Sequence, residues 1–328
     1  MLTEVSVVIC AHNAERTIDR ALRSIEPLLI QGVKVIIVDD ASSDTTWQIL
    51  EEFRTRFLSI ELIRIVRGGS AGARNAGLSH VSSKYVMFCD SDDEISSSSF
   101  TILNSLDLEV DFIVFDYELI ETTQLKTKKT LNGVLGAEKK QELSLDIKDI
   151  LMSEMGFWRY IYSTSFLKDN KIRFVGELDE ICADYFVLDD YFFLLGVLSQ
   201  AKTFVYIPRT IYRYFFNSSA SYESFRRQSR FMGKAAKIQM EELEDVLNSK
   251  AVGWFGSMLT KQLFSSFRAL NVADIYQFSQ SFWTAIWKSN KKFRKVSLSR
   301  NLIDVCQIMQ IITKKSLIRI IQLWTNIK

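Results

Sequence analysis

Three carboxylates crowd into the four positions 90–93, directly after the apolar run at residues 85–88. Like charges packed this closely repel one another, so a folded protein keeps them ionised with the help of a compensating cation. Mg²⁺ and Mn²⁺ bind carboxylate oxygens and often share those sites with substrate phosphates. The pair Asp90 and Asp92, at the expected end of a strand, is therefore a candidate metal–diphosphate site. A solvated acidic turn is the alternative, because Asp and Ser are common turn residues.

Apolar, β-branched runs alternate with helical patterns up to this turn. We expect buried strands at 5–10, 33–38, 60–66 and 85–89, with helices between them. Strands that are apolar throughout predict a mostly parallel sheet covered by helices on both faces. Ligands bind outside the carboxyl ends of the strands in such sheets. Asn13, Asp40 and Asp90 follow three different strands, so we expect these polar residues to meet at one edge of the sheet.

The pattern beyond residue 110 predicts further strands and then a wholly helical region. We expect a strand at 111–119, a solvated hairpin or loop insertion at 121–148, an aromatic helix at 157–170, an extended segment at 171–174, a helix opening at Asp189, and strands at 203–207 and 210–215 around Pro208. From residue 221, apolar positions at three- and four-residue spacing predict helices at 231–247, 251–270, 274–289 and 298–327. We therefore divide the chain into an α/β domain at 1–217 and a helical region at 218–328.

The 328 residues suffice for one large domain and a smaller one. The net charge of +2 hides an asymmetry, because residues 220–328 carry 18 Lys and Arg against 7 Asp and Glu, whereas the preceding part has a net charge of −9. The four cysteines show no paired spacing and no Cys/His cluster that would suggest zinc, so we expect reduced thiols in a cytoplasmic protein. We expect neither a secretory signal nor a membrane-spanning helix.

The motifs at the strand ends resemble those of the family 2 glycosyltransferases, which are inverting enzymes with a GT-A fold. The matching segments are 7–13, 37–44, 69–77 and 90–93, which read VVICAHN, IVDDASSD, GSAGARNAG and DSDD. Their order and spacing make the match specific, and residues 157–192 are similar to the family's acceptor-side region. The resemblance covers roughly residues 4–217 and implies a GT-A, Rossmann-like domain there, whereas the helical tail is not covered.

The resemblance implies that a nucleotide-sugar donor, expected to be a UDP-sugar, binds at the ends of the first two strands. Asp40 corresponds to the aspartate that accepts the imide N–H of uracil, and a carboxylate is suited to that role. Ala11 and Asn13 would line the nucleoside pocket. His12 stands where the family usually has Tyr, and Arg67 where it usually has Asn, so these two positions depart from the pattern. His12 keeps a flat ring for stacking in the donor pocket, and a satisfied loop histidine is the alternative.

The donor's diphosphate would lie near Arg74 and the acidic turn. Arg74 resembles the family's diphosphate- or base-contacting arginine, and the first turn of a helix favours an anion. A salt bridge to a nearby carboxylate is the alternative for Arg74. Asp92 would ligate Mn²⁺ or Mg²⁺, while Asp90 would contact the ribose or the metal's water shell, with Ser91 in the same donor-binding loop. The metal would neutralise the departing diphosphate.

Inversion needs a carboxylate that takes the proton from the attacking acceptor hydroxyl. Asp190 resembles the family's general base, and Asp189 precedes it where Glu is usual, as the second choice for the base. A carboxylate that merely favours the first turn of a helix is the alternative for either residue. Trp158 is a candidate floor for the acceptor sugar, with core packing as its alternative.

The basic cluster at 291–300 and the Leu- and Ile-rich helix behind it fit an interfacial helix on an anionic membrane. A helical subdomain that packs on the sheet or on a second subunit, as in a homodimer, is the alternative. No nucleic-acid motif accompanies the charge, so nucleic acid is not expected as a partner. We expect a cytoplasmic protein that lies at the inner face of the cell membrane.

These features together predict a metal-dependent inverting glycosyltransferase that moves a sugar to a hydroxyl of a glycan or lipid-linked oligosaccharide, as in bacterial surface-polysaccharide assembly. A catalytically silent nucleotide-sugar-binding or scaffold protein remains an alternative. A sugar-nucleotide pyrophosphorylase is another, although the residues after the first strand do not form its Gly-rich, Lys-containing phosphate loop. A Rossmann dehydrogenase is excluded, because no GxGxxG follows a strand.

Overall fold

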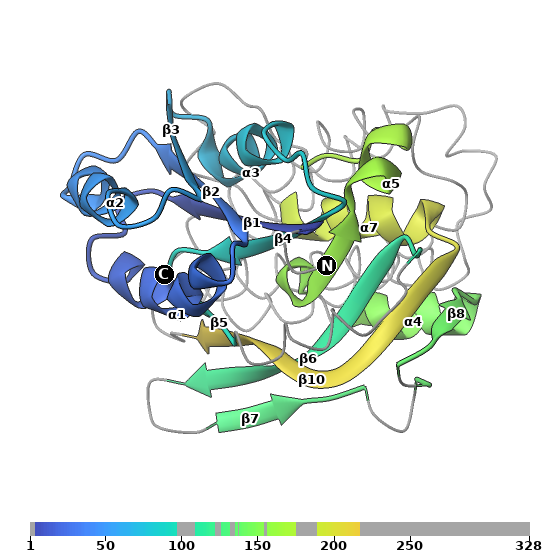
Figure 1. The fold of residues 1–328 in the computed structure, drawn as a ribbon. Helices are drawn as coiled ribbons and strands as arrows, with labels where there is room; N and C mark the ends of the chain where they lie inside the picture. The colour runs from blue at the N-terminus through green and yellow to red at the C-terminus, as the bar shows by residue number, and fades with distance from the viewer. Residues whose placement is uncertain are drawn as a thin grey trace, which may run out of the picture. The chain divides into compact units, whose positions relative to one another are not determined.

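The structure is a computed structural model (Figure 1). It describes residues 4–96, 109–121, 126–131, 135–136, 138–153, 156–174 and 189–216. All of them belong to the first of two units into which the chain divides, Met1–Ser221 and Tyr222–Lys328. The four helices expected after residue 231, the basic cluster at 291–300 and the expected division after residue 217 lie outside the described residues.

One mixed, mostly parallel sheet organises the described residues, as expected for the α/β class. Its strands are β1 (Val5–Ala11), β2 (Lys34–Asp40), β3 (Ile60–Ile65), β4 (Tyr85–Asp90), β5 (Glu94–Ile95), β6 (Phe112–Glu121), β7 (Lys126–Lys129), β8 (Lys140–Glu142), β9 (Tyr160–Ser163) and β10 (Thr203–Phe216). They follow the order β3-β2-β1-β4-β9-β6-β10-β5, with β7 beside β6 and β8 beside β10. The β1–β2, β2–β3, β1–β4 and β6–β10 pairs are parallel. Parallel pairing of β1 to β4 brings their carboxyl ends to one edge.

Helices cover both faces of the parallel part of the sheet. The described helices are α1 (Ile18–Ile30), α2 (Thr46–Arg54), α3 (Gly69–Ser79), α4 (Leu145–Ser153), the 3₁₀ turn η3 (Phe157–Arg159), α5 (Thr164–Asp169) and α7 (Asp189–Gln200). The strand order reverses between β3 and β4, and right-handed crossovers then place α1 and α2 on one face and α3 on the other (Figure 1). No described helix is long and apolar enough to cross a membrane.

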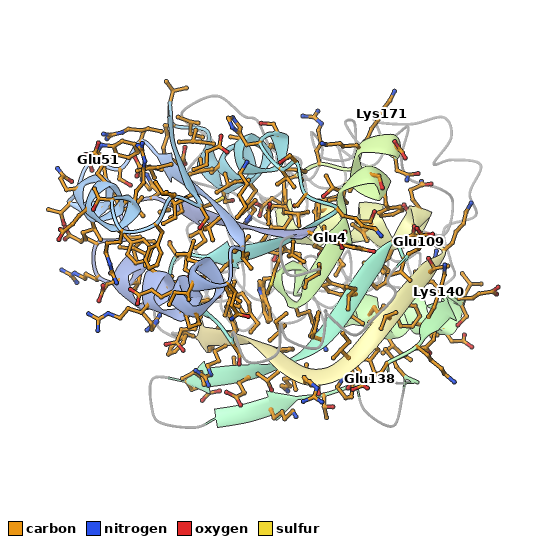
Figure 2. All side chains as sticks on the ribbon, in the orientation of Figure 1. Glu4, Glu51, Glu109, Glu138, Lys140 and Lys171 are labelled. Atoms are coloured by element: carbon orange, nitrogen blue, oxygen red, sulfur yellow. The ribbon has the colours of Figure 1, made fainter. Side chains whose placement is uncertain are left out.

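The core lies where apolar strands meet these helices. In β1, Val7, Val8 and Ile9 are fully buried, because both faces of the strand are covered. Gly77 lets α3 approach the sheet closely, since a Cβ at this position would collide with the Val8 side chain. Charged side chains such as Lys171 project from the outside of the molecule (Figure 2). The closely packed sheet and helices position the loops at the carboxyl edge of the strands.

Two sequence-based expectations are wrong in detail, and a third is confirmed in part. Residues 157–170 are not one helix, because β9 inserts antiparallel between β4 and β6 and is buried along its length. The two strands expected around Pro208 form the single strand β10, whose pairing with β6 shifts register between Ile207 and Tyr212. Such an irregularity accommodates a proline that cannot donate to the ladder. The hairpin expected within 121–148 is confirmed in part, because β7 pairs antiparallel with β6, but this segment also contains β8 and the start of α4.

Candidate functional site

The ends of β1 and β2 are joined by side-chain hydrogen bonds. His12 Nδ1 lies 2.7 Å from the backbone oxygen of Asp40, so this nitrogen carries the proton. His12 Nε2 then accepts from the Asn13 amide at 3.1 Å. Asn13 Oδ1 accepts from the backbone N–H of Ser43 at 2.8 Å, and the Asn13 backbone adopts a left-handed φ of 48° that Asn tolerates well. Both ring nitrogens of His12 are therefore engaged, which holds its flat face in a fixed orientation.

Asp40 is placed at this edge as expected, but its carboxylate is already engaged. Its Oδ1 accepts from the backbone N–H of Gly68 at 2.6 Å, and its Oδ2 forms an ion pair with Arg67. Only 3% of the Asp40 side chain is exposed. The departure at position 67 thus has a structural consequence, because Arg67 covers the carboxylate expected to contact the base. Asp39 is equally buried and pairs with Arg64 at 3.1 Å, which favours a structural role.

Arg74 links the acidic turn to the helix that carries the candidate base. Its Nη2 lies 2.7 Å from Asp90 Oδ1, and its Nη1 lies 2.6 Å from Asp189 Oδ2. The Ser70 hydroxyl donates to the same Asp189 oxygen at 2.8 Å. Burial disfavours the charge of Arg74, but Asp90 and Asp189 outweigh this effect and raise its pKa. The ion-pair alternative for Arg74 is therefore realised in the structure, and one of the partners is 115 residues away.

The three carboxylates of the turn have different environments. Asp90 pairs with Arg74, and the fully buried Asp93 accepts from the Tyr212 hydroxyl at 2.7 Å and the Phe215 N–H at 2.8 Å. Burial, with the charges of the two neighbouring aspartates, raises the pKa of Asp93 to about 8. Among the described residues no cationic side chain forms an ion pair with Asp92.

Asp92 has the donor chemistry of a metal ligand. Partial burial of its carboxyl group and the charge of Asp90 raise its pKa to about 6, although the residue as a whole is exposed. A bound divalent cation would relieve this repulsion, so Asp92 and Asp90 fit a hard metal. The described residues contain no group of three protein ligands that could hold an ion by themselves. A metal here would therefore need oxygens from another source, such as phosphates or water.

Asp190 lies in the first turn of α7, where it is half-buried. The Tyr214 hydroxyl connects it electrostatically to the turn, because burial and then the charges of Asp93, Asp90, Asp92 and Asp190 raise the pKa of Tyr214. The charges of both motifs therefore act on the same hydroxyl. Trp158 is only 7% exposed and stacks on the rings of Tyr212 and Tyr214 at 4.4 and 5.2 Å, so its main contacts are with the core.

Several residues at the site were not singled out from the sequence. Ser70 and Tyr212 bond the carboxylates of Asp189 and Asp93, and Arg20 donates to the backbone carbonyl of Asp92. The sequence showed that Arg67 departs from the family pattern, but it did not predict the ion pair of Arg67 with Asp40. Ser, Tyr and Arg occur throughout the sequence, so neither residue type nor spacing identified the other three.

Comparison with known proteins gives a consistent family match. Residues 6–164 match the family model described as Glycosyl transferase family 2. The poly(ribitol-phosphate) beta-N-acetylglucosaminyltransferase TarS of Staphylococcus aureus is 26% identical over 264 residues, which cover 77% of this chain and 44% of TarS. The UDP-Glc:alpha-D-GlcNAc-diphosphoundecaprenol beta-1,3-glucosyltransferase WfgD of Escherichia coli is 28% identical over 197 residues, which cover 55% of this chain and 76% of WfgD. The chain spans about half the length of the first curated relatives that it matches.

Solved structures share the fold. TarS residues 1–349 give a TM-score of 0.62 at 18% identity, over 89% of this chain and 82% of that one. The complex of this TarS fragment with UDP-GlcNAc gives a TM-score of 0.61. The mannosyltransferase PcManGT from Pyrobaculum calidifontis, in complex with GDP-Man and Mn²⁺, gives a TM-score of 0.51 at 12% identity, over 95% of this chain and 83% of that one.

Proposed function

Because residues 6–164 belong to glycosyl transferase family 2, we propose that this chain transfers a sugar, with inversion, from a nucleotide-diphosphate sugar to an acceptor hydroxyl. Its fold is the expected GT-A type. The observation that carries the proposal is the ion-paired chain Asp90–Arg74–Asp189, which joins the acidic turn to the first turn of α7. Transfer with inversion needs one group that stabilises the leaving diphosphate and another that takes the proton of the acceptor hydroxyl. The acidic turn would supply the first and the first turn of α7 would supply the second.

The donor would bind across the ends of β1, β2 and β4. His12 and Asn13 offer a fixed ring face and amide to the nucleoside, and Asp40 offers a carboxylate to the base. We propose UDP as the nucleotide, with the uracil N–H donating to Asp40 beside or in place of Arg67. TarS has been solved with UDP-GlcNAc and WfgD is named for UDP-Glc, which supports this choice, whereas PcManGT holds GDP-Man.

Asp190 would act as the general base, and Asp189 would hold Arg74. Asp189 has its Oδ2 committed to Arg74 and Ser70, so a proton-accepting role would cost two hydrogen bonds. Asp190 occupies the same turn, and its charge acts on the Tyr214 hydroxyl together with the charges of the acidic turn. This division revises the second choice of Asp189 as base. The acceptor hydroxyl would lose its proton to Asp190 as it attacks the sugar carbon.

Asp92, with support from Asp90, would hold Mn²⁺ or Mg²⁺ together with the donor's phosphates. A bound metal would supply Lewis-acid neutralisation of the leaving diphosphate. Arg74 would add a fixed positive charge on the same side, because its guanidinium is buried and always protonated. PcManGT was solved with Mn²⁺, which supports this assignment by analogy of fold.

We propose a glycan or lipid-linked glycan as the acceptor, because WfgD is named for a diphosphoundecaprenol-linked sugar and TarS for poly(ribitol-phosphate). The region after residue 217 would form a separate helical part that contacts the acceptor, a second copy or an anionic membrane surface. The basic cluster at 291–300 is the feature that supports contact with an anionic membrane surface. We further propose that the chain works at the cytoplasmic face of the membrane, where nucleotide-sugars are made.

Thermal unfolding of the full chain with UDP or GDP, in Mn²⁺ or in EDTA, tests donor binding. Saturation at about 100 times Kd stabilises a protein by about 2.7 kcal/mol, or about 5–10 °C in Tm for a unit of this size. We expect that shift with UDP and Mn²⁺, and its loss in Asp92→Asn. Asp169→Asn, an exposed carboxylate at the end of α5, is the matched control and should keep it. Absence of any nucleotide-dependent shift would contradict the proposal.

Turnover separates an enzyme from a silent binder. Slow release of UDP from UDP-GlcNAc or UDP-Glc, with water as acceptor, should be detectable in the wild type by chromatography. It should disappear in Asp190→Asn, which retains the donor-induced Tm shift. A wild-type chain that binds UDP-sugars yet never releases UDP, even with added lipid-linked glycans, would favour the scaffold alternative.

A further inference from the structure

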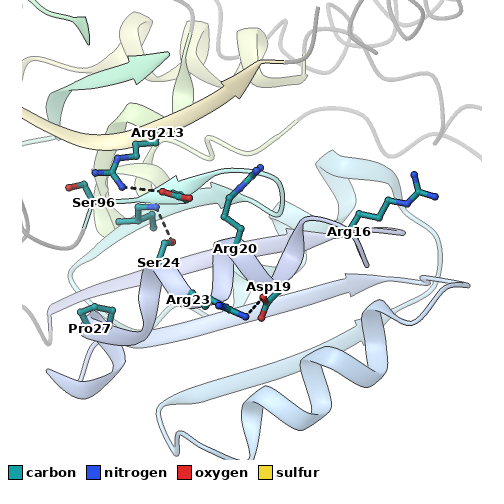
Figure 3. Close-up of a pocket in the computed structure, with 10 residues that line it drawn as sticks. Arg16, Asp19, Arg20, Arg23, Ser24, Pro27, Ser96 and Arg213 are labelled. Carbon is teal, nitrogen blue, oxygen red and sulfur yellow. Dashed lines mark hydrogen bonds and ion pairs between the residues drawn. The ribbon is translucent and has the colours of Figure 1, made fainter. Parts of the chain in front are cut away.

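A second charged site lies beside the acidic turn, on the face of the sheet that α1 covers. A pocket of about 670 Å³ is lined by residues of α1, of the loop before it, and of β5 and β10 (Figure 3). This volume lies within the range of small-ligand sites. Most ligand pockets are apolar, whereas four arginines line this one, namely Arg16, Arg20, Arg23 and Arg213.

The arginines differ in how far they are neutralised. Arg23 pairs with Asp19 at 2.7 Å, and Arg213 pairs with Glu94 at 3.1 Å (Figure 3). Glu118 also contacts Arg213, at 3.2 Å, so that residue is fully compensated. In the described part of the chain, no carboxylate pairs with Arg16 or Arg20. Arg20 lies in the first turn of α1 and Arg16 lies in the loop before the helix, and both line the pocket.

Arg20 is held in a fixed position in the wall of the pocket by two contacts. Its guanidinium stacks on Phe215 with 3.6 Å between its central carbon and the ring centroid, and it donates to the neutral carbonyl of Asp92. Its Nε is buried and lacks a hydrogen-bond partner among the described residues. A buried N–H donor without an acceptor is costly, so a ligand that supplies an acceptor is favoured there. Arginine's planar fork suits phosphate oxygens in particular.

We propose that this pocket binds the phosphate or diphosphate group of a ligand other than the sugar donor, held by Arg16 and Arg20. The inference goes beyond the proposed function, since the donor groups Arg74 and Asp40 belong to α3 and β2 and line no part of this pocket. Arg20 touches both the pocket and the Asp92 carbonyl. A ligand here therefore contacts a residue that also holds the acidic turn.

Calorimetric titration of the full chain with inorganic pyrophosphate and phosphate, in EDTA, tests the site directly. We expect Arg16→Gln to weaken pyrophosphate binding about tenfold, because one charge-assisted contact is lost. Arg54→Gln, an exposed arginine of α2 outside the pocket, is the matched control and should bind like the wild type. Arg16 has no ion-pair partner among the described residues, so its replacement leaves the fold intact.

Two further measurements identify the source and the place of binding. Vesicles of phosphatidylglycerol in phosphatidylcholine, in a flotation assay, distinguish a lipid headgroup from a soluble phosphate group, and Arg16→Gln should weaken whichever is bound. Saturating UDP should not displace pyrophosphate, and the Mn²⁺-dependent Tm shift with UDP should persist in Arg16→Gln. Equal binding by wild type and Arg16→Gln, or competition by UDP, would overturn the inference while leaving the proposed donor site untouched.

Discussion

Asp189→Asn and Asp190→Asn are neighbouring, isosteric substitutions that should have opposite effects. Asp189 accepts two hydrogen bonds at one oxygen, from Arg74 and Ser70, with only 8% of its side chain exposed. Hydrogen bonds to a charged group contribute about 1.5–3 kcal/mol each. An asparagine oxygen keeps the geometry but loses the charge, and Arg74 retains Asp90. We therefore expect a loss of about 2 kcal/mol for Asp189→Asn, or about 4–8 °C in Tm.

Asp189→Asn should also weaken donor binding, because Arg74 loses one of the two carboxylates that fix its position. Asp190→Asn should lower Tm less than Asp189→Asn does, because the Asp190 side chain is half-buried whereas that of Asp189 is buried. It should nevertheless abolish release of UDP from a UDP-sugar. The two assays are differential scanning fluorimetry and chromatographic measurement of UDP, on both variants and the wild type.

The reverse pattern would refute this reasoning. If Asp189→Asn kept its Tm and lost all turnover while Asp190→Asn remained active, Asp189 would be the base and Arg74 would be held by Asp90 alone. A double variant adds a test of coupling. Asp189→Asn combined with Ser70→Ala should cost less than the sum of the single changes, because the first weakens and the second removes the same 2.8 Å bond.

Three further outcomes follow from the packing and the charges. Gly77→Ala should lower the free energy of unfolding by about 1–2 kcal/mol, because the added Cβ would clash with Val8. Gly72→Ala, in the same helix, should raise the free energy of unfolding by about 0.5–1 kcal/mol, because its Cβ would meet open space. Urea denaturation measures both. Arg67→Asn should cost about 1–2 kcal/mol because it uncovers a buried carboxylate, and saturating UDP should recover more stability in it than in the wild type. In EDTA, the wild type should lose stability as the pH rises from about 4 to about 8, since Asp93 keeps its proton only when folded, and Asp93→Asn should flatten that slope.

The parallel half of the sheet could be predicted from the sequence because local signals there agree. β1 and β2 are apolar throughout, and each is followed by a polar turn and a helical pattern. The local signals at residues 160–163 did not decide between strand and helix, since aromatic residues suit a buried strand and a buried helix equally. Long-range pairing with β4 and β6 decides that they form a strand. Pro208 looked like a strand break because the partner that tolerates its missing N–H, β6, lies about ninety residues earlier.

The candidate site was predictable at the level of motifs and not of pairings. The strand ends that carry Asn13, Asp40 and Asp90 follow from the fold class, since parallel strands share their carboxyl edge. The identity of each partner depends on side chains that converge from distant elements. Nothing local to position 74 or position 189 indicates that the two residues form an ion pair across 115 positions.

The acidic turn shows why like charges can persist at this edge of the sheet. Arg74 approaches Asp90 from the α3 side, and Arg20 holds the Asp92 carbonyl from the α1 side. Hydrogen-bond donors from β10 take both oxygens of Asp93. Arg74 therefore compensates the charge of Asp90, and burial keeps Asp93 protonated up to a pKa of about 8. Arg20 fixes the backbone of Asp92, whose carboxyl group has a pKa raised to about 6. A charge left uncompensated on a rigid turn costs the fold stability, and a divalent cation shared with substrate phosphates offsets that cost when the donor binds.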